Sequence, residues 1–544
     1  MGPQTAPRDH DLPDSSPTNS VAPMRLAIRS VCRPVAAVVF CCLWIVSGQA
    51  AEKSSSYLAA LDSITDQDLS RYVGRLADNA LEGREAGTRG GRAAADYLAE
   101  QFARVHLHGA GDNGGFFQPF APNFRNVLGI IQGSDPELRS QVIVVGAHYD
   151  HVGYGGRGSS LGPYGYIHPG ADDNASGVSA VLELAEAFTF LPSPPKRSVL
   201  FAAWDAEEKG LLGSKQWTAH PTVPLNQVVA GLNMDMIGRL RDDHLIIFGS
   251  RSGCGWRRLL SCQNDGLGLA LEFSWSLKPN ADHYPLFDHN IPVIMAHTGV
   301  HENYHRPSDG AKLINGPGMT RVTRLLFGVV YDMAERPAAV PSFRAAARQE
   351  TPQTEKAILA QVGKPADRLG VGWVDDPATA GGVRVALVAA GSAAERAGLR
   401  LGDRITRFAG RDIRSDNDFF AAVSSAESPA AMAVNRPGEE KPLDLTAELP
   451  GSPLRWGIAW RVDDAEPGTI ILVHVVPGSP AANAGLKAGD RIYQVGGRDF
   501  ADEGAFAQLA KTLPEPVQLL VERDGRLRTV MLQFRQAEPS KRAA

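Results

Sequence analysis

Side chains that can bind a metal or move a proton stand directly after three short apolar runs of this chain. In chain order they are His148, Asp150, Glu207, Glu208 and Asp235. Taken singly, each has an ordinary explanation, since adjacent glutamates such as Glu207 and Glu208 also suit the first turn of a helix. Gathered at one edge of a sheet, however, carboxylates repel one another and require cations. Mixed histidine and carboxylate ligands suit zinc.

The apolar runs that precede these residues predict the elements that position them. Runs 141–147, 198–204 and 228–234 are short, as buried strands are, and 177–188 carries apolar residues at the spacing of a buried helix face. Strands that alternate with helices predict an α/β fold with a mixed, centrally parallel sheet flanked by helices. Because ligands bind outside the carboxyl ends of strands in such sheets, we expect the candidate residues to meet there.

Two further stretches supply candidates. Asp172, Asp173 and Asn174 stand just before the predicted helix, where such residues usually cap its N-terminus. Late in the same part of the chain, 301–309 reads His-Glu-Asn-Tyr-His-Arg-Pro-Ser-Asp and contributes Tyr304 and His305.

In this order, the motifs resemble those of the co-catalytic di-zinc exopeptidases of clan MH, peptidase family M28, which include bacterial leucyl aminopeptidase. The resemblance covers about 52–335, the expected zinc peptidase domain, and implies two Zn²⁺ ions. It implies that one zinc is held by His148 and Asp235 and the other by Glu208 and His305. Asp173, the acid directly before the Asn-Ala-Ser-Gly turn, would bridge them.

The same resemblance implies the catalytic roles. Glu207 would be the general base toward the metal-bound water. Tyr304 would offer its hydroxyl to the developing oxyanion, although a packed aromatic ring beside His305 is the alternative. Asp150 would orient His148, as metal-bound histidines usually require, and Asp309 is a weaker candidate for the same service to His305.

This chain also departs from the family pattern. A long insert rich in glycine and tyrosine, 153–169, separates His148 from Asp173, and we expect it to wall the cleft. Four more histidines lie near the motifs but match no ligand position, so we expect them not to bind metal: His151, His168, His283 and His301.

The C-terminal third contains a tandem repeat. Segments 391–413 and 478–500 are identical at 13 of 23 positions, and the two units, placed at 366–449 and 453–537, resemble small β-rich PDZ domains of the bacterial periplasmic-protease type. The resemblance implies binding of a peptide C-terminus as an added strand, with candidate carboxylate loops at 368–371 and 454–457. The alternative is that one or both units bind no peptide or only pack on the peptidase domain. Residues 336–365 are expected to be a linker.

The N-terminus reads as a leader, 1–51. From Met24 a basic segment, the apolar run 35–46 and small residues up to Ala50 are typical of a secretory signal peptide, and translation starting at Met24 is one interpretation. An uncleaved anchor is the alternative, although the apolar run is short for a membrane span. The remaining cysteines, Cys254 and Cys262, form a disulfide or stay reduced; spacing leaves both open.

Composition limits the classes of function. The length of 544 residues predicts roughly three domains, and a net charge of −5 without a strongly basic half argues against nucleic acid as a partner. The sequence therefore predicts an exported, periplasmic or extracellular, zinc exopeptidase, most specifically an aminopeptidase acting on peptides with a free N-terminus. Rival hypotheses are a glutaminyl cyclase-like or carboxypeptidase activity on the same fold, or a non-catalytic peptide-binding scaffold.

Overall fold

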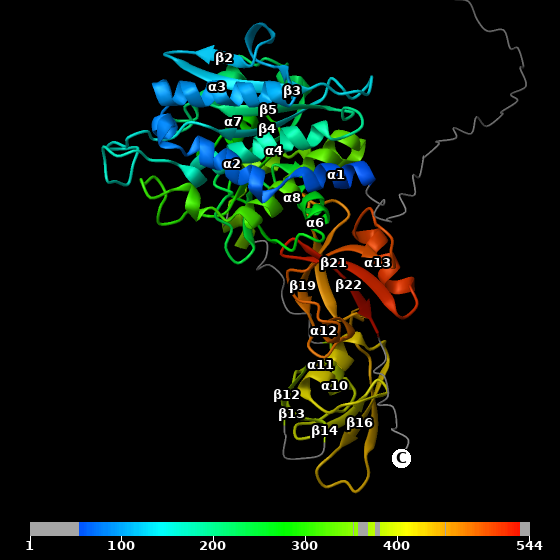
Figure 1. The fold of residues 1–544 in the computed structure, drawn as a ribbon. Helices are drawn as coiled ribbons and strands as arrows, with labels where there is room; N and C mark the ends of the chain where they lie inside the picture. The colour runs from blue at the N-terminus through cyan, green and yellow to red at the C-terminus, as the bar shows by residue number, and fades with distance from the viewer. Residues whose placement is uncertain (1–53, 352, 357–367, 376–380, 452, 534–544) are drawn as a thin grey trace, which may run out of the picture. The chain divides into compact units, whose positions relative to one another are not determined.

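The computed structural model describes residues 54–351, 353–356, 368–375, 381–451 and 453–533 (Figure 1). The expected leader, including the signal peptide, lies outside the described residues, as does part of the expected linker, 352 and 357–365. In the described part of the chain, no helix combines the length and apolar character needed to cross a membrane.

A nine-stranded sheet is the framework of the N-terminal part. Its strand order is β1-β3-β5-β4-β6-β10-β7-β9, with β2 beside β3. The four central strands are parallel, whereas β3 and β7 pair antiparallel with β5 and β10. This confirms the mixed, centrally parallel sheet predicted from the sequence. The strands are β1 (His108–Gly109), β2 (Phe117–Phe120), β3 (Phe124–Ile131), β4 (Val142–His148), β5 (Ser198–Trp204), β6 (Val228–Met234), β7 (His244–Phe248), β9 (Ala270–Phe273) and β10 (Val293–His297).

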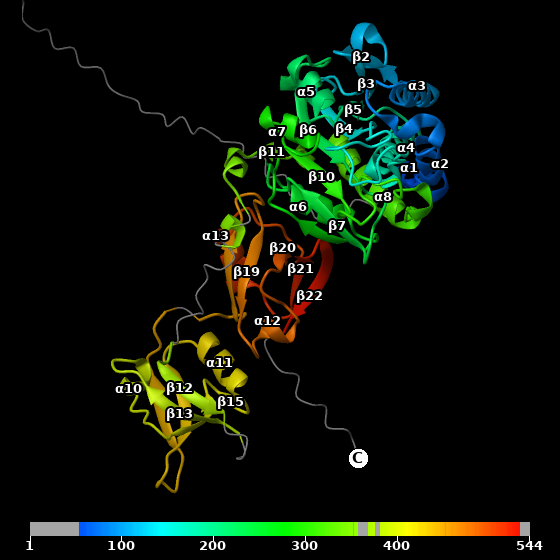
Figure 2. The same cartoon turned by 90° about the vertical axis from the view of Figure 1, so that its left-hand side faces the viewer.

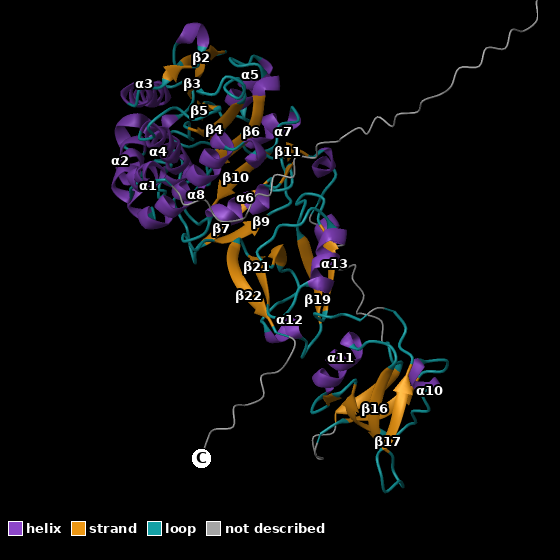
Figure 3. Ribbon diagram, turned by 90° about the vertical axis from the view of Figure 1, so that its right-hand side faces the viewer, coloured by secondary structure: helices purple, strands orange, loops and turns teal. Residues whose placement is uncertain are grey.

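Helices cover both faces of this sheet (Figures 2 and 3). One face carries α1 (Ser55–Ser63), α2 (Asp66–Leu76), α4 (Gly177–Thr189) and α8 (Gly316–Glu335), with α3 (Arg89–Arg104) beside β3. The opposite face carries α5 (Leu212–Ala219) and α7 (His283–Asp288). Helix α6 (Trp256–Gln263) packs against α8. A parallel centre covered on both faces requires strands that are apolar throughout, as the three runs are.

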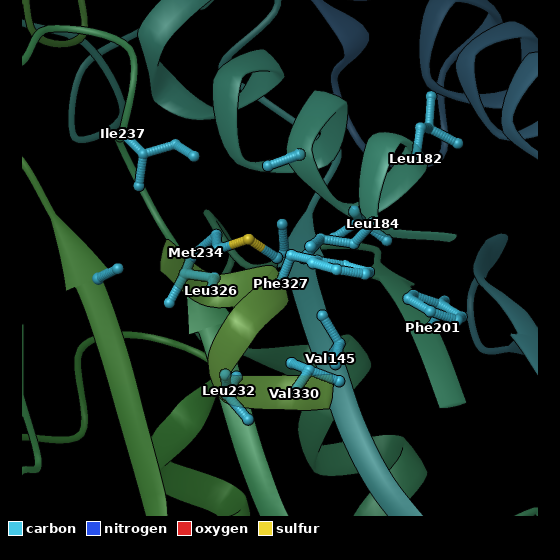
Figure 4. Packing of buried hydrophobic residues seen from close by; sticks show 14 of the residues in the cluster. Val145, Leu182, Leu184, Phe201, Leu232, Met234, Ile237, Leu326, Phe327 and Val330 are labelled. Atoms are coloured by element: carbon cyan, nitrogen blue, oxygen red, sulfur yellow. The ribbon is translucent and has the colours of Figure 1, made fainter. Parts of the chain in front are cut away.

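The core on the α4 and α8 face is formed by alternate strand residues. Figure 4 shows Val145 and Leu232 of the sheet packed with Leu184 of α4 and Phe327 of α8. Val144, one residue earlier, faces the other layer with Leu200 and Trp217. Full burial of one such side chain contributes about 1.5–3 kcal/mol, so the central strands form a rigid base for the loops at their carboxyl ends.

The C-terminal part contains two antiparallel sheets, each with its own apolar core. The first has strands β12 (Val371–Asp375), β13 (Val383–Val388), β14 (Arg404–Phe408), β15 (Arg411–Asp412), β16 (Ala430–Asn435) and β17 (Leu443–Ala447), with helices α10 (Ala393–Arg396) and α11 (Asp416–Ser425). The second has strands β18 (Ile458–Val462), β19 (Ile470–Val475), β20 (Arg491–Val495), β21 (Val517–Arg523) and β22 (Arg526–Leu532), with helices α12 (Pro480–Asn483) and α13 (Glu503–Thr512). The expected β-rich units are confirmed.

The structure adds detail to two expectations from the sequence, those for the linker and for the two cysteines. Part of the expected linker forms a short strand, β11 (Ser342–Phe343), which pairs antiparallel with β8 (Gly253–Cys254). This pairing could not be predicted because it joins segments about ninety residues apart. Cys254 and Cys262 are both free thiols, which is the reduced alternative of the two that spacing had left open.

Candidate metal centre

The candidate residues lie where neighbouring parallel strands end. His148 is the last residue of β4, which lies between β5 and β6. The register pairs His148 with Trp204 and Gly146 with Asn233. Glu207 and Glu208 follow Trp204 by three and four residues, and Asp235 follows β6 directly. Adjacent parallel strands therefore deliver these side chains to one edge of the sheet.

The first group of potential ligands consists of His148, Glu207 and Asp235, whose ligand atoms all lie within 4.8 Å of one another. The Nε2 atom of His148 lies 3.6 Å from Oδ1 of Asp235 and 3.4 Å from Oδ1 of Asp173. Two ligands on a tetrahedral zinc, with bonds of about 2.0–2.2 Å, are separated by about 3.3 Å. The spacing of this group therefore fits a zinc ion.

The second group consists of His151, Asp173, Glu208 and His305. The Nε2 atom of His305 lies 3.0 Å from Oδ2 of Asp173 and 3.2 Å from Oε2 of Glu208. Asp173 thus turns one carboxylate oxygen toward His148 and the other toward His305. All five ligands expected from the sequence come together in two adjoining groups, with Asp173 between them.

His151 is the unexpected member of the second group. Its Nδ1 atom lies 2.9 Å from Oε1 of Glu208 and 3.8 Å from Oδ2 of Asp173. The ring is fully buried, and its Nε2 atom has no hydrogen-bond partner. The sequence analysis set His151 aside from the metal site, whereas the structure puts it in direct contact with a candidate ligand. The available signal was its place in the strand-end motif, three residues after His148.

Asp150 supports both the histidine and the glutamates. Its Oδ1 atom lies 3.7 Å from Nδ1 of His148, and that nitrogen is also 3.2 Å from the Asp150 carbonyl oxygen. The carboxylate accepts hydrogen bonds from the backbone N–H groups of Glu207 at 2.9 Å and Glu208 at 3.4 Å. Asp150 therefore couples the end of β4 to the segment that follows β5.

Asp172 and Asp309 hold the backbone of the turn before α4. Asp172 accepts a hydrogen bond from the Gly238 N–H at 2.6 Å and lies 3.1 Å from Nε2 of His301. Asp309 was expected to serve His305, but its Oδ2 atom instead accepts from the backbone N–H groups of Asp172 and Asp173 at 3.0 and 3.2 Å. It therefore acts on the turn that carries Asp173.

Arg84 is a positioning residue that the sequence analysis missed. Its side chain is fully buried and donates to four backbone carbonyls, those of Leu76, Tyr149, Pro169 and Gly170. Burial lowers the pKa of Arg84 to about 10, opposed by nearby carboxylates of which Asp173 is the strongest. The guanidinium joins the His-Tyr-Asp loop to the start of the Asp172–Asp173 turn. No local sequence pattern predicts a residue with these contacts.

The electrostatics of the site favour a cation. Burial alone would lower the pKa of His305, but its hydrogen bonds with Asp173 and Glu208 raise it to about 10. Burial alone would likewise lower the pKa of His148, yet Glu207, Asp150, Asp173 and Asp235 hold it well above the usual value. Carboxylates that stabilise a proton on these rings so strongly provide the same attraction for a metal ion.

Glu207 and Tyr304, beside the candidate zinc ligands, both have side chains of raised pKa that favour the protonated form. Burial raises the pKa of Glu207 well above its usual value; His148 opposes this shift, and the negative charge of Asp282 adds to it. Burial followed by the charge of Asp173 raises the pKa of Tyr304, so its phenol stays a hydrogen-bond donor. The Tyr304 ring also stacks on His305, with centroids 3.9 Å apart, which is the packed-ring alternative; the role of its hydroxyl toward an oxyanion stays a prediction.

The three other histidines set aside have separate environments. His301 contacts Asp172, and Nε2 of His168 lies 2.6 Å from Oγ of Ser160. Both ring nitrogens of His283 lack hydrogen-bond partners, and burial lowers its pKa to about 4. None of these three belongs to either group of potential ligands in the described residues.

The chain matches two known families over separate segments. Residues 126–330 match peptidase family M28, and residues 384–436 and 472–523 each match the PDZ domain. The chain therefore carries an M28 peptidase domain followed by two PDZ domains, as the resemblances implied.

Three similar proteins are named as peptidases. The chain is 25% identical over 223 residues to aminopeptidase YwaD of Bacillus subtilis. The matched segment covers 39% of this chain and 45% of the relative. The chain is 32% identical over 158 residues to leucine aminopeptidase 1 of Trichophyton rubrum, covering 28% and 40%. It is 36% identical over 115 residues to a probable glutamate carboxypeptidase of Arthroderma benhamiae, covering 20% and 14%. The chain thus spans less than half the length of these relatives.

Among solved structures, the LapA aminopeptidase of Legionella pneumophila is 22% identical. It matches with a TM-score of 0.43 over 52% of this chain and 76% of that one. A zinc aminopeptidase from Bacillus subtilis is 16% identical, with a TM-score of 0.42 over 52% and 98%.

Proposed function

We propose that this protein is a zinc-dependent aminopeptidase that removes N-terminal residues from peptides with a free amino terminus. The observation that carries the proposal is the pair of adjoining His/carboxylate groups around Asp173, the first of which includes Glu207 from the loop after β5. Relatives named as aminopeptidases support the choice of reaction.

The residues divide between two metal positions. His148 and Asp235 would hold one zinc, Glu208 and His305 the other, and Asp173 would bridge them. Histidine nitrogens and carboxylate oxygens at these separations are a donor set that zinc accepts. When bound, the two ions would supply a water of lowered pKa and polarise the scissile carbonyl.

The chain itself would move the protons. Glu207 would take a proton from the attacking water on its carboxylate and deliver it to the leaving amine. The phenol of Tyr304 would donate a hydrogen bond to the carbonyl oxygen as negative charge develops on it. Asp150 would hold the Glu207 backbone and the His148 ring in fixed positions relative to each other.

The first test is release of p-nitroaniline from a panel of aminoacyl p-nitroanilides by protein beginning at residue 52. Activity should fall on chelation, return with zinc and vanish when the substrate amine is acetylated. The opposite result is a zinc-loaded protein that releases nothing from any p-nitroanilide of the panel but removes C-terminal residues or cyclises N-terminal glutamine. That result would contradict the aminopeptidase proposal and favour the corresponding rival activity.

For the PDZ domains we propose capture of peptide C-termini, which would recruit a substrate or a partner. Strands β12 and β18 end their sheets, so each offers an edge for strand addition. On each edge strand a tryptophan packs on a helix. The ring centroids of Trp373 and Phe419 of α11 lie 5.0 Å apart, and those of Trp460 and Phe506 of α13 lie 5.1 Å apart.

Within the expected carboxylate loops, Arg368 donates to the carbonyls of Val423, Ala426, Pro450 and Gly451. Capture would therefore rely on the backbone of the loop. Labelled peptides with a free C-terminus should bind, and the same peptides amidated should not. Equal binding of the two forms would contradict the proposal.

Export is proposed from the leader pattern alone. Expression in a bacterial host with an intact secretion pathway should yield a mature chain beginning near residue 51, identified by N-terminal sequencing. A chain that retains residues 24–50 would instead favour the uncleaved anchor.

A further inference from the structure

We propose that the insert 153–169 binds apolar side chains of the substrate on the C-terminal side of the cleaved bond. The binding element is the aromatic rim, defined here as Tyr154, Leu161, Tyr164 and Tyr166. This inference rests on the proposed aminopeptidase function and adds to it a preference for peptides with apolar or aromatic residues after the first.

The four side chains of the rim are exposed. The exposed fractions are 48% for Tyr154, 58% for Leu161, 52% for Tyr164 and 63% for Tyr166, all within thirteen residues of chain. Exposed apolar side chains that gather in one place usually mark an interaction site. Tyrosine suits such a surface because its ring is apolar and its hydroxyl remains hydrated.

The insert is held in a defined conformation by buried polar groups. Ser160 and His168 are buried and contact each other at 2.6 Å. The second ring nitrogen of His168 lies 2.8 Å from the Tyr166 carbonyl oxygen, and the Gly165 N–H donates to the Tyr154 carbonyl at 2.8 Å. This buried network holds the backbone of the insert, on which the rim side chains are exposed.

The insert is also fastened to the candidate metal centre. The Leu161 N–H and the Ser160 hydroxyl both donate to the carbonyl oxygen of His305 at 3.1 Å. Arg306 returns hydrogen bonds to the carbonyls of Leu161 at 2.8 Å and Gly162 at 3.1 Å. The rim therefore begins next to the backbone of a candidate zinc ligand.

Burial decides which part of the substrate the rim can reach. The candidate ligands lie at or below the surface: His148 and Asp173 are buried, with 1% and 3% exposed, whereas Glu208, Asp235 and His305 are partly exposed. An aminopeptidase must bring the first peptide bond of its substrate to that buried position, so the chain after this bond continues outward. The exposed rim beside His305 is placed for those outward residues. The insert contains one arginine, Arg157, and no carboxylate, so nothing in it opposes apolar or acidic peptides.

The test compares zinc-loaded wild-type enzyme on Leu-Gly-Gly and Leu-Phe-Tyr, with leucine amide as the minimal substrate. One aromatic contact contributes about 0.5–1.5 kcal/mol, so kcat/KM should be about 2- to 10-fold higher for the aromatic peptide. The double variant Tyr164→Ser/Tyr166→Ser should bring this ratio close to one. The matched control is Phe190→Ser, which removes an aromatic residue of 54% exposure at the end of α4 and should keep the wild-type ratio.

The outcomes separate the two proposals. Wild-type enzyme that cleaves both peptides with a ratio of one overturns the rim and leaves the aminopeptidase standing. The same conclusion follows if the double variant keeps the full ratio. If the zinc-loaded wild-type protein cleaves none of the three substrates, the proposed function fails and the rim falls with it. The wild-type comparison needs no variant to fold.

Discussion

Asp172 and Asp173 are adjacent carboxylates to which the fold gives different partners. Asp172 accepts from the Gly238 backbone and contacts His301, which fixes the turn, whereas Asp173 lies between His148 and His305. Glu207 and Glu208 separate in the same way, because only Glu208 contacts His151 and His305. At this scale, the fold decides which of two chemically equivalent neighbours faces the candidate metal centre.

The Glu207→Gln variant tests the general base. Because the amide cannot accept the water proton, kcat should fall by about 10²- to 10⁴-fold, while zinc content stays at two per chain. Glu208→Gln is the matched variant and should lower zinc content instead. Kinetics with metal analysis on both proteins would decide, and near wild-type turnover by Glu207→Gln would refute the assignment.

The His151→Gln variant tests the residue that the sequence analysis set aside. Loss of the contact between His151 and Glu208 should weaken zinc binding by about 10- to 100-fold, as removal of groups that orient metal ligands usually does. Titration against a competing chelator would measure this. His244→Gln, at an exposed histidine paired with Glu272, is the control, and equal affinities in the two variants would show that His151 has no such role.

At the scale of elements, the site is assembled from the loops that follow β4, β5, β6 and β10. These loops contain little helix or strand, and side chains from other segments of the chain hold them in place. Asp150 links the loops after β4 and β5, Asp309 reaches the turn before α4, and Arg84 ties η1 (Asn79–Arg84) to both ends of the loop after β4. Buried polar contacts therefore position the ligands that the rigid sheet only brings near.

The Arg84→Lys variant tests this arrangement. An ammonium cannot reproduce the planar fork that serves four carbonyls. Each buried acceptor left without a partner costs about 1–3 kcal/mol, so the free energy of unfolding should fall by at least about 2 kcal/mol in urea denaturation. Arg89→Lys, at an exposed pair with Glu82, should change little, and similar losses in both variants would contradict the role of Arg84.

Helix α4 carries a buried acid, Glu183, that should make stability depend on pH. Burial raises the pKa of Glu183 from 4.5 to about 8, with Asp68 adding to the shift, and its Oε1 atom lacks a hydrogen-bond partner. Because the unfolded chain loses this proton first, the stability present below pH 4.5 is lost progressively up to about pH 8.

Glu183→Gln should therefore be more stable than the wild type near pH 8, by about 1.4 kcal/mol for each unit of pKa shift. The difference should shrink toward pH 5. Urea denaturation at several pH values would measure it, with the exposed Glu100→Gln as control. A difference that is constant across this range would disprove the effect.

At the scale of the whole molecule, the chain joins an M28 peptidase domain to two PDZ domains that have their own cores. Both groups of potential metal ligands in the described residues belong to the peptidase domain. Metal binding should consequently stabilise one part of the protein selectively, because a ligand stabilises only the unit that binds it.

Calorimetry of the full chain with and without zinc tests this expectation. At free zinc 100-fold above Kd, the peptidase domain should gain about 2.7 kcal/mol per site, and its transition should move to higher temperature. The transitions of the PDZ domains should stay in place. A uniform shift of every transition, or none, would argue against a metal site confined to the peptidase domain.

The sequence by itself determined the framework and pointed to the candidate ligands. Apolar runs defined β5 and β6 to the residue and β4 to within one, and the repeat identified two equivalent β-rich units, because periodicity and local composition reflect burial directly. The ordered motifs, through their resemblance to the M28 family, then implied the five candidate ligands and Glu207, and the strand ends of the parallel sheet explained why several of them should meet at one edge.

Only the tertiary structure decided the contacts between distant segments. The contact of His151 with Glu208, the four carbonyls served by Arg84 and the turn held by Asp309 join residues far apart in the chain. The same is true of the insert fastened to His305. No local pattern encodes such pairs, because they follow from the way the packed loops come together and from the tendency of buried polar groups to be hydrogen-bonded.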